Sequence, residues 1–215
     1  MRQLFNVNNY KARWLFLFLI AMYLIISYIL NTSIVSDQII VQSYTLMPDY
    51  QLPSLIAALK KSQSFSYFLL PFLILIKVVV LTLIIFIAII FLEIDISFNP
   101  ILKVTLLSEF VFVIAALVKV IGLMYFHDIN TLEDLAVYTP LSLYSILGDT
   151  FGKYFVYPLK VINVFELLYI AILSYALSIV LDIDYFKSVR AILLTYGVAL
   201  LLWIVLLMFL QYAYM

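Results

Sequence analysis

The residues from Phe65 to Leu92 restrict the fold more than any other feature, because Lys77 is their only charged residue. From Val78 onward, every residue of this segment except Thr82 is apolar. A helix of about 20 mostly apolar residues crosses the hydrocarbon core of a bilayer and satisfies its own backbone hydrogen bonds. A strand of a membrane barrel would instead alternate apolar and polar residues. The segment therefore predicts a membrane-spanning helix.

The composition of the whole chain agrees with a membrane protein. Hydrophobic residues make up 67% of the 215 residues and charged residues only 11%, with a mean hydropathy of +1.19. Soluble domains carry about 25% charged residues and cannot bury so large an apolar fraction. A soluble globular domain, a disordered chain and a nucleic-acid-binding protein are thereby excluded. The absence of cysteine excludes disulfides and thiolate chemistry.

Five segments are long and apolar enough to span a bilayer, and the predicted fold is an all-α transmembrane bundle that forms a single domain over residues 1–215. The expected spans are residues 14–30, 65–92, 101–125, 161–181 and 191–212. A basic stretch precedes the first span, as in a signal peptide, but no small-residue cleavage pattern follows it. We therefore interpret this segment as an uncleaved first helix.

Basic residues predict the orientation of the bundle, since they concentrate on the cytoplasmic side of a membrane. Five spans place the following basic residues on one side: Arg2, Lys11, Arg13, Lys103, Lys187 and Arg190. On the opposite side, Lys60, Lys61, Lys153 and Lys160 are spread through longer loops. The prediction is a bacterial cytoplasmic (inner) membrane protein with a cytoplasmic N-terminus and an external C-terminus.

The two outer loops each contain a short helical pattern, and we expect them to pack together over the bundle. Residues 53–61 begin with proline and end with two lysines, which predicts a short loop helix, either at the membrane interface or packed on the bundle. In the second loop, the segment containing Pro140, Leu141 and Tyr144 is apolar but too short to cross. It predicts an interfacial or re-entrant segment that ends near Gly148.

Four charged residues inside the predicted spans are the candidate functional site: Lys77, Glu109, Lys119 and Glu166. Charges in hydrocarbon normally face the bundle interior and form pairs. Counted from the predicted outer edges, Lys119 and Glu166 lie at depths of about 9 and 8 Å, which predicts that they pair. Lys77 and Glu109 both fall near the middle; if the second helix begins at Pro71, however, Lys77 competes for Glu166.

These charges have two interpretations, either as buried ion pairs that fix neighbouring helices or as a path for protons or a substrate. We favour the structural interpretation, because two acids and two bases at similar depths neutralise one another. No catalytic signature is present, and Gly148 followed by Asp149 matches only part of an intramembrane aspartyl protease motif. His127 is the only histidine. We therefore expect no catalytic residues, no metal site and no cofactor.

The C-terminal half resembles bacterial members of the Yip family of Ypt/Rab-interacting membrane proteins. The resemblance covers residues 138–212 and rests on three features: Pro140-Leu141-Ser142-Leu143, Asn163-Val164-Phe165-Glu166 and Lys187-Ser188-Val189-Arg190-Ala191. It implies a five-span bundle with a cytoplasmic N-terminus. Eukaryotic relatives are linked to vesicle traffic and small GTPases, but only thirteen residues precede Trp14 here, so we do not expect GTPase binding.

The favoured function is a non-catalytic membrane accessory or interaction protein. Its expected partners are the lipid bilayer and another integral membrane protein, with no nucleic acid. Because some bacterial relatives look like accessory partners of exporters, the resemblance implies an ABC-type exporter as one candidate partner. The alternative function is a small permease that uses the four intramembrane charges. A permease should give water access to these charges, whereas an accessory protein should seal them.

Overall fold

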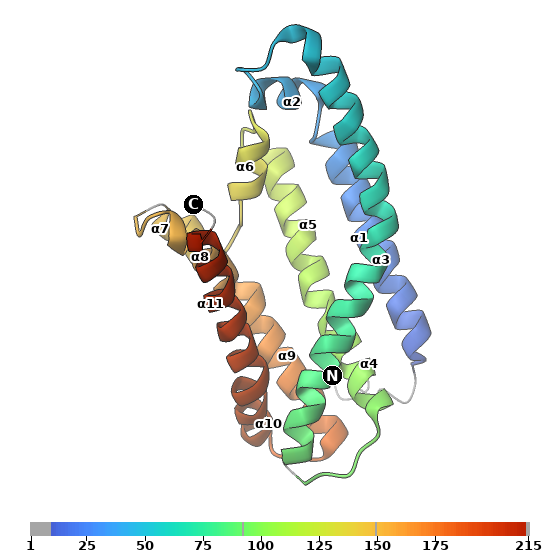
Figure 1. Cartoon of the computed structure of the whole chain (residues 1–215). Helices are drawn as coiled ribbons and strands as arrows, with labels where there is room; N and C mark the ends of the chain where they lie inside the picture. Colours follow the sequence, from blue (N-terminus) through green and yellow to red (C-terminus); the bar gives the residue numbers. More distant parts are fainter. Residues whose placement is uncertain (1–9, 92, 149, 214–215) are drawn as a thin grey trace.

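A computed structural model describes residues 10–91, 93–148 and 150–213, and all regular secondary structure in these ranges is helical (Figure 1). The α-helices, in chain order, are α1 (Ala12–Ser33), α2 (Asp37–Ser43), α3 (Leu52–Phe91), α4 (Phe98–Ser108), α5 (Phe110–Tyr125), α6 (Leu132–Val137), α7 (Leu143–Leu147), α8 (Val156–Val161), α9 (Val164–Leu181), α10 (Tyr185–Ile192) and α11 (Val198–Ala213). Two short 3-10 helices cover Asp49–Gln51 (η2) and Lys153–Phe155 (η3), and a π-helical turn, Leu193–Gly197 (η4), joins α10 to α11.

Among the described residues, five helical segments are long and apolar enough to cross a membrane, as predicted. They are Ala12–Ser33, Asp49–Phe91, Phe98–Tyr125, Val164–Leu181 and Tyr185–Ala213. The side chains on their outer faces are largely apolar, notably along α3 and α11, which is consistent with contact with a lipid bilayer. The chain is thus an all-helical membrane protein.

The second span differs from the prediction in its outer part. Residues 53–61 do not form a separate loop helix, because α3 continues through them without a break from Leu52 to Phe91. Pro53 occupies the first turn, where a missing N–H is tolerated. Pro71 lies inside the helix and does not end it, since membrane-spanning helices tolerate proline where neighbouring groups satisfy the freed backbone carbonyl. The result is a helix of 40 residues, about 60 Å long.

Helix capping moves the starts of the last two spans away from the predicted positions. The Asn163 side chain accepts a hydrogen bond from the Glu166 N–H at 2.8 Å, so α9 begins at Val164 and not at residue 161. Asp184 accepts hydrogen bonds from the N–H groups of Phe186 and Lys187, so the fifth span begins at Tyr185 and not at residue 191. In both cases a polar side chain satisfies N–H groups that have no partner within the helix.

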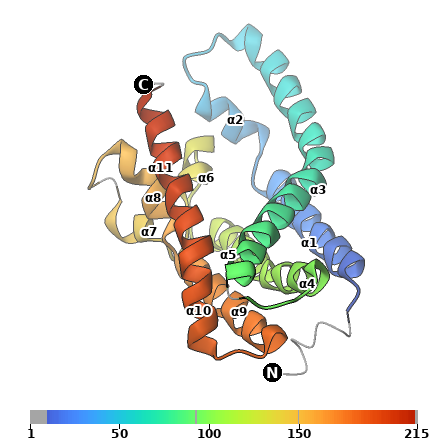
Figure 2. The same cartoon turned by 60° about the horizontal axis from the view of Figure 1, so that its bottom comes forward.

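Two apolar cores hold the bundle together. The first joins α3, α4, α9 and α10 around residues such as Ile85, Ile101, Leu173 and Ile192, all of which are fully buried. The second joins α1, α3, α4 and α5 around Leu19 and neighbouring residues. Helix α11 has no buried residue and contacts α8 and η3 (Figures 1 and 2). Helices α3, α4, α9 and α10 therefore surround the larger of the two buried cores.

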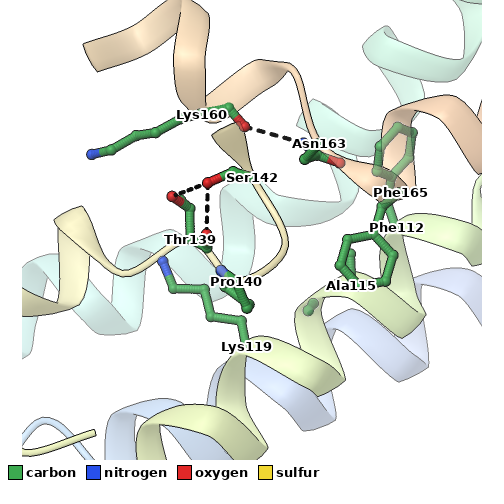
Figure 3. A pocket seen from close by; sticks show the side chains of 10 residues that line it. Phe112, Ala115, Lys119, Thr139, Pro140, Ser142, Lys160, Asn163 and Phe165 are labelled. Carbon is green, nitrogen blue, oxygen red and sulfur yellow. Dashed lines mark hydrogen bonds between the residues drawn. The ribbon is translucent and has the colours of Figure 1, made fainter. Parts of the chain in front are cut away.

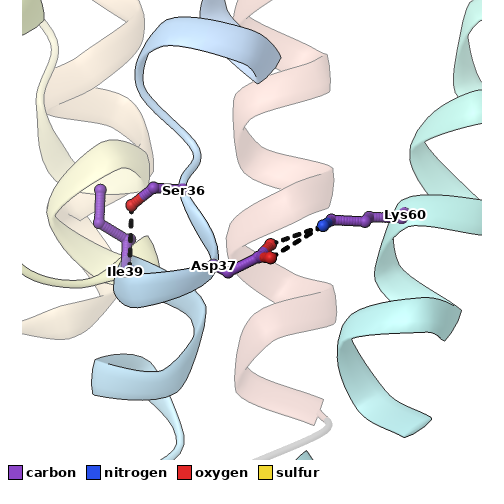
Figure 4. Close-up of polar contacts among 4 residues, drawn as sticks. All are labelled: Ser36, Asp37, Ile39 and Lys60. Carbon is purple, nitrogen blue, oxygen red and sulfur yellow. Dashed lines mark hydrogen bonds and ion pairs between the residues drawn. The ribbon is translucent and has the colours of Figure 1, made fainter. Parts of the chain in front are cut away.

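The two outer loops pack together at one end of the molecule, as predicted. Helix α2 contacts both α6 and the N-terminal part of α3, and the Leu132 N–H donates to the Ser43 hydroxyl at 2.7 Å. Lys60 on α3 forms an exposed ion pair with Asp37 on α2 at 2.8 Å (Figure 4). We refer to residues 34–70 and 126–138 as the outer cap. Figure 1 shows it opposite the end at which α1 begins and α9 turns into α10.

Candidate functional site

Lys77 and Glu109 form an ion pair inside the bundle. The Lys77 Nζ donates to Glu109 Oε2 at 2.6 Å, and the ammonium lies 4.1 Å from the centre of the Phe112 ring. The Glu109 side chain is only 1% exposed, whereas that of Lys77 is 46% exposed. The prediction that Lys77 lies within reach of Glu109 is confirmed. The pair joins the middle of α3 to the junction of α4 and α5.

Glu109 lies where the third span changes its hydrogen bonding. The Phe112 N–H donates to the Glu109 carbonyl at 3.0 Å. This bond joins residues three apart in the sequence, whereas a regular α-helix joins residues four apart. Just before Glu109, the Ser108 hydroxyl donates to the Val104 carbonyl, and the Thr105 hydroxyl donates to the Ile101 carbonyl. Such hydroxyl bonds to the preceding turn often bend a helix. The bend divides the span into α4 and α5 and leaves the Glu109 carboxylate in the bundle interior.

Glu166 has a hydroxyl partner in place of a cation. It lies in the first turn of α9, where a carboxylate is favoured by the helix dipole, and Tyr196 donates its hydroxyl to Glu166 Oε1. Tyr196 belongs to the π-helical turn η4, a geometry that is uncommon outside functional or strained positions. This contact ties α9 to the fifth span.

Tyr169 connects the two halves of the site. Its ring is fully buried and packs against Phe112 at 4.8 Å and against Tyr196 at 5.3 Å. Its hydroxyl lies beside Glu109 and interacts with that carboxylate. We refer to Lys77, Glu109, Glu166, Tyr169 and Tyr196 as the buried cluster.

The buried cluster combines one ammonium group with two carboxyl groups. Glu109 is paired with the cation, while Glu166 relies on a neutral hydroxyl and is 9% exposed. This chemistry can fix helices in place, and the second carboxyl can also hold or release a proton. No three His, Asp or Glu side chains within the described ranges gather where a metal ion could bind.

Lys119 does not belong to the buried cluster, and the predicted pairing with Glu166 is wrong. Within the described residues Lys119 forms no ion pair. The ring contact of Phe112 with Tyr169 shows which levels of α5 and α9 match. From that level Lys119 lies seven residues outward, about 10 Å, whereas Glu166 lies only three residues outward, about 4.5 Å. The predicted depths were counted from outer helix ends that are not level with each other.

The outer-loop residues form a short segment that ends at Gly148, as predicted, while its position at the membrane interface stays a prediction. Helix α7 covers only Leu143–Leu147 and ends at Gly148, whose positive φ of 54° and N–H bond to the Tyr144 carbonyl close the turn. Tyr144 is buried and lies under the Lys160 ammonium at 5.1 Å, whereas Leu141 is exposed. Pro140 lines a pocket beside α5. A bridge from residues 141–143 to residues 162–164 anchors this segment.

Sequence reasoning missed the two tyrosines of the buried cluster. Tyr169 follows Glu166 by three residues and therefore shares its helix face, a spacing that could have identified it. Asn163 precedes Glu166 by the same interval, which is the spacing of a helix start signal. No sequence spacing indicated Tyr196, because the π-helical turn sets the direction in which its side chain points.

Compared with models of known families, with curated proteins and with solved structures, the chain matches none. The resemblance of residues 138–212 to the Yip family therefore stays a prediction. A function for this chain has to be inferred from the geometry of its buried cluster and its outer cap.

Proposed function

We propose that this chain is a non-catalytic accessory protein of the bacterial cytoplasmic membrane that binds another integral membrane protein through its outer cap. The observation that carries this proposal is the length of α3. Its 40 residues extend about 60 Å, roughly twice the thickness of a hydrocarbon core of about 30 Å. When the apolar C-terminal half of α3 crosses the bilayer, its N-terminal half projects beyond it and carries α2 outward.

The surface of the outer cap supports a role in binding a protein. Its loop after α2 presents Leu46, which is fully exposed, and Tyr50, which is 79% exposed. Exposed apolar and aromatic side chains on a part that projects from the membrane are typical of a docking surface. By the positive-inside rule the cap lies outside the cytoplasm, so the partner must have an external part of its own.

The buried cluster supports the same proposal. Glu109 and Glu166 are almost fully sealed, and each has a partner within the bundle. A substrate path needs access to its charged groups, whereas a structural cluster is best kept away from water and lipid. The resemblance to bacterial Yip proteins agrees with an accessory function and suggests an ABC-type exporter as the partner to test first.

The test uses single cysteines, which are clean probes because the chain has none. Leu46→Cys in the cap and Leu201→Cys on the exposed face of α11 are each labelled with a photo-cross-linker in native membranes. We expect Leu46→Cys to give one specific adduct, identified by mass spectrometry, that the control lacks and that a Tyr50→Asp change weakens. Identical adducts from both positions would contradict binding through the cap.

A small permease is the second candidate, and one observation favours it. Two helix irregularities, the junction at Glu109 and the π-helical turn at Tyr196, meet at the buried cluster, and transporters often build ion sites from interrupted helices. The discriminating experiment is proton uptake into vesicles that contain only the purified chain. Uptake that Glu166→Gln abolishes without loss of stability would favour the permease over the accessory protein.

A further inference from the structure

A pocket with a volume of about 190 Å³ lies beside the outer part of α5, outside the buried cluster (Figure 3). Its inner wall is apolar and includes Phe112, Phe165, Ala115 and Ala116. Two lysines from distant parts of the chain, Lys119 on α5 and Lys160 on α8, also line it. The pocket is therefore apolar at one end and cationic at the other.

The two lysines line the same pocket, so their like charges repel each other. Within the described residues Lys119 makes no ion pair. Lys160 donates to the Ala136 carbonyl at 2.9 Å, which fixes its position near the pocket. Two like charges that are partly removed from water raise the energy of an empty pocket, and an anion between them lowers it.

The wall of the pocket is preformed. Ser142 is 1% exposed, and its hydroxyl bonds to the Thr139 carbonyl at 2.7 Å and contacts the Thr139 hydroxyl at 3.0 Å. The Asn163 amide donates to the carbonyls of Lys160 and Val161. These bonds hold the loop at residues 139–142 and the start of α9 in place, so a ligand would enter without first ordering the chain.

The position of the pocket matches the level of lipid head groups. Lys119 lies six residues, about 9 Å, from the outer end of α5. Nearby, Trp203 donates to the Tyr157 hydroxyl at 3.0 Å, and Tyr154 packs on Tyr212. Tryptophan and tyrosine gather where the hydrocarbon core meets the head groups. The cationic end of the pocket therefore lies near the bilayer surface.

We propose that this pocket binds one anionic phospholipid, with its phosphate between Lys119 and Lys160 and the first part of an acyl chain on Ala115, Ala116 and Phe165. Each end of the pocket suits one part of such a lipid. The ammonium groups attract the phosphate, while the two alanines leave space that an alkyl chain fills. Small residues on a membrane helix permit such close approach of a neighbour. The site is separate from Leu46 and Tyr50, the exposed residues of the outer cap that we propose to contact a protein partner.

The experiment measures lipid binding to the purified full chain in detergent by native mass spectrometry and by the shift in thermal midpoint. The probes are phosphatidylglycerol, phosphatidylcholine with the same acyl chains, and inorganic phosphate. We expect phosphatidylglycerol to bind most tightly. Lys119→Gln should lower the affinity for phosphatidylglycerol about tenfold, the size expected for one lost charged contact. Lys61→Gln, which removes an exposed lysine of the outer cap, should leave the affinity unchanged.

A second variant tests the apolar end of the pocket without touching a charge. Ala116→Leu fills the space for the acyl chain and should weaken the binding of phosphatidylglycerol. The thermal midpoint of the lipid-free protein should stay close to that of the wild type. Equal binding of phosphatidylglycerol and phosphatidylcholine, or full affinity in Lys119→Gln, overturns the proposal. If inorganic phosphate binds as tightly as the lipid and Ala116→Leu has no effect, the ligand is a free anion and the lipid assignment is wrong.

Discussion

Two ion pairs of the described chain have nearly the same length and similarly exposed lysines, but their carboxylates lie in opposite surroundings. Lys77 and Glu109 are 2.6 Å apart inside the bundle, with the carboxylate 1% exposed. Lys60 and Asp37 are 2.8 Å apart in the outer cap, with both side chains 57% exposed. Exposed pairs contribute about 0–1 kcal/mol, whereas removing one partner of a buried pair costs about 3–5 kcal/mol. The length of an ion pair therefore does not measure its contribution to stability.

The two regions also differ in what the pairs connect. The buried pair joins two spans whose positions are already fixed by apolar cores, and its loss leaves an unsatisfied carboxylate among them. The exposed pair joins α2 to α3 in a cap that has few buried residues of its own. We therefore expect the bundle to unfold cooperatively and the cap to unfold locally.

The largest effect is expected for Lys77→Met, which leaves Glu109 sealed and without a cation. This variant should lose about 3 kcal/mol of stability, at the lower end of the range for buried pairs because Lys77 itself is half exposed. Glu109→Gln should cost less, since the long lysine side chain can turn toward the bilayer surface. Thermal unfolding in detergent measures both, with Lys187→Met as a surface control. A stable Lys77→Met would show that the pair does not support the fold.

A smaller effect is expected for Tyr196→Phe, which removes the hydroxyl donor of Glu166. A buried acceptor without a partner costs about 1–3 kcal/mol. Tyr28→Phe is the matched control, because its ring is 62% exposed and surface changes stay within about 0.5 kcal/mol. Replacing both partners, in Tyr196→Phe with Glu166→Leu, should recover part of the loss. Equal stability of the two tyrosine variants would exclude the contact as a structural one.

The joint between the outer cap and the bundle should respond to Gly122→Ala. A Cβ at Gly122 would lie 2.1 Å from the Tyr138 hydroxyl and 2.9 Å from the ring carbon that carries it. This overlap should outweigh the gain of about 1 kcal/mol in helix propensity and leave a net loss of about 1 kcal/mol. At Gly197 the nearest atom is 3.7 Å away, so Gly197→Ala should be neutral or stabilising.

A Tyr138→Leu background sharpens the test at this joint. With the tyrosine hydroxyl and ring removed, Gly122→Ala should change from destabilising to stabilising, because only the helix propensity remains. If Gly122→Ala destabilises equally in both backgrounds, the close approach of the tyrosine is not the cause.

The cap should loosen in acid through Asp134, a half-buried residue outside the spans. Hydrogen bonds from the N–H groups of Asn130 and Thr131 hold the pKa of this carboxyl below its ordinary value. A carboxyl with a lowered folded-state pKa stabilises the fold above its unfolded pKa, and this stabilisation is lost as the pH falls through the folded value. The effect is therefore confined to strongly acidic solution.

Hydrogen exchange of the α6 amides, corrected for the intrinsic pH dependence, measures this loss between about pH 7 and pH 3. Protection of α6 should fall in acid and no longer depend on pH in Asp134→Asn. The neighbouring Glu133→Gln should keep the wild-type pH profile, because only Asp134 completes the capping box with Thr131. A pH profile that Asp134→Asn leaves unchanged would assign the acid sensitivity to another group.

Much of the fold was predictable because each span is a long apolar run. The same reasoning failed in the outer part of α3, where Lys60 and Lys61 suggested the end of a short helix. A helix that leaves the bilayer changes from apolar to polar without a break, so the change in composition gives no sign of where it ends. The π-helical turn around Tyr196 was equally hidden, since no residue pattern distinguishes it from the α-helix on either side.

The contacts of the candidate site were predictable only where two side chains lie at the same depth and on facing sides of their helices. Lys77 and Glu109 both lie near the middle of their spans, where small errors in a helix boundary do little harm. Lys119 and Glu166 lie near outer ends, and the cap at Asn163 shortened one helix by three residues. Residue type also misled: a carboxyl group was assumed to need a lysine, whereas Tyr196 supplies the hydrogen bond to Glu166.

The structural role of the buried cluster is tested most directly by double-mutant cycles for the two ion pairs in the same detergent. One cycle combines Lys77→Met with Glu109→Leu, and the other combines Lys60→Met with Asp37→Leu. We predict a coupling free energy of about 2 kcal/mol or more for the buried pair, with the double variant more stable than Lys77→Met alone. The exposed pair should couple by less than about 0.5 kcal/mol and weaken further in salt. Equal coupling in the two cycles, or additive losses for Lys77 and Glu109, would contradict that role.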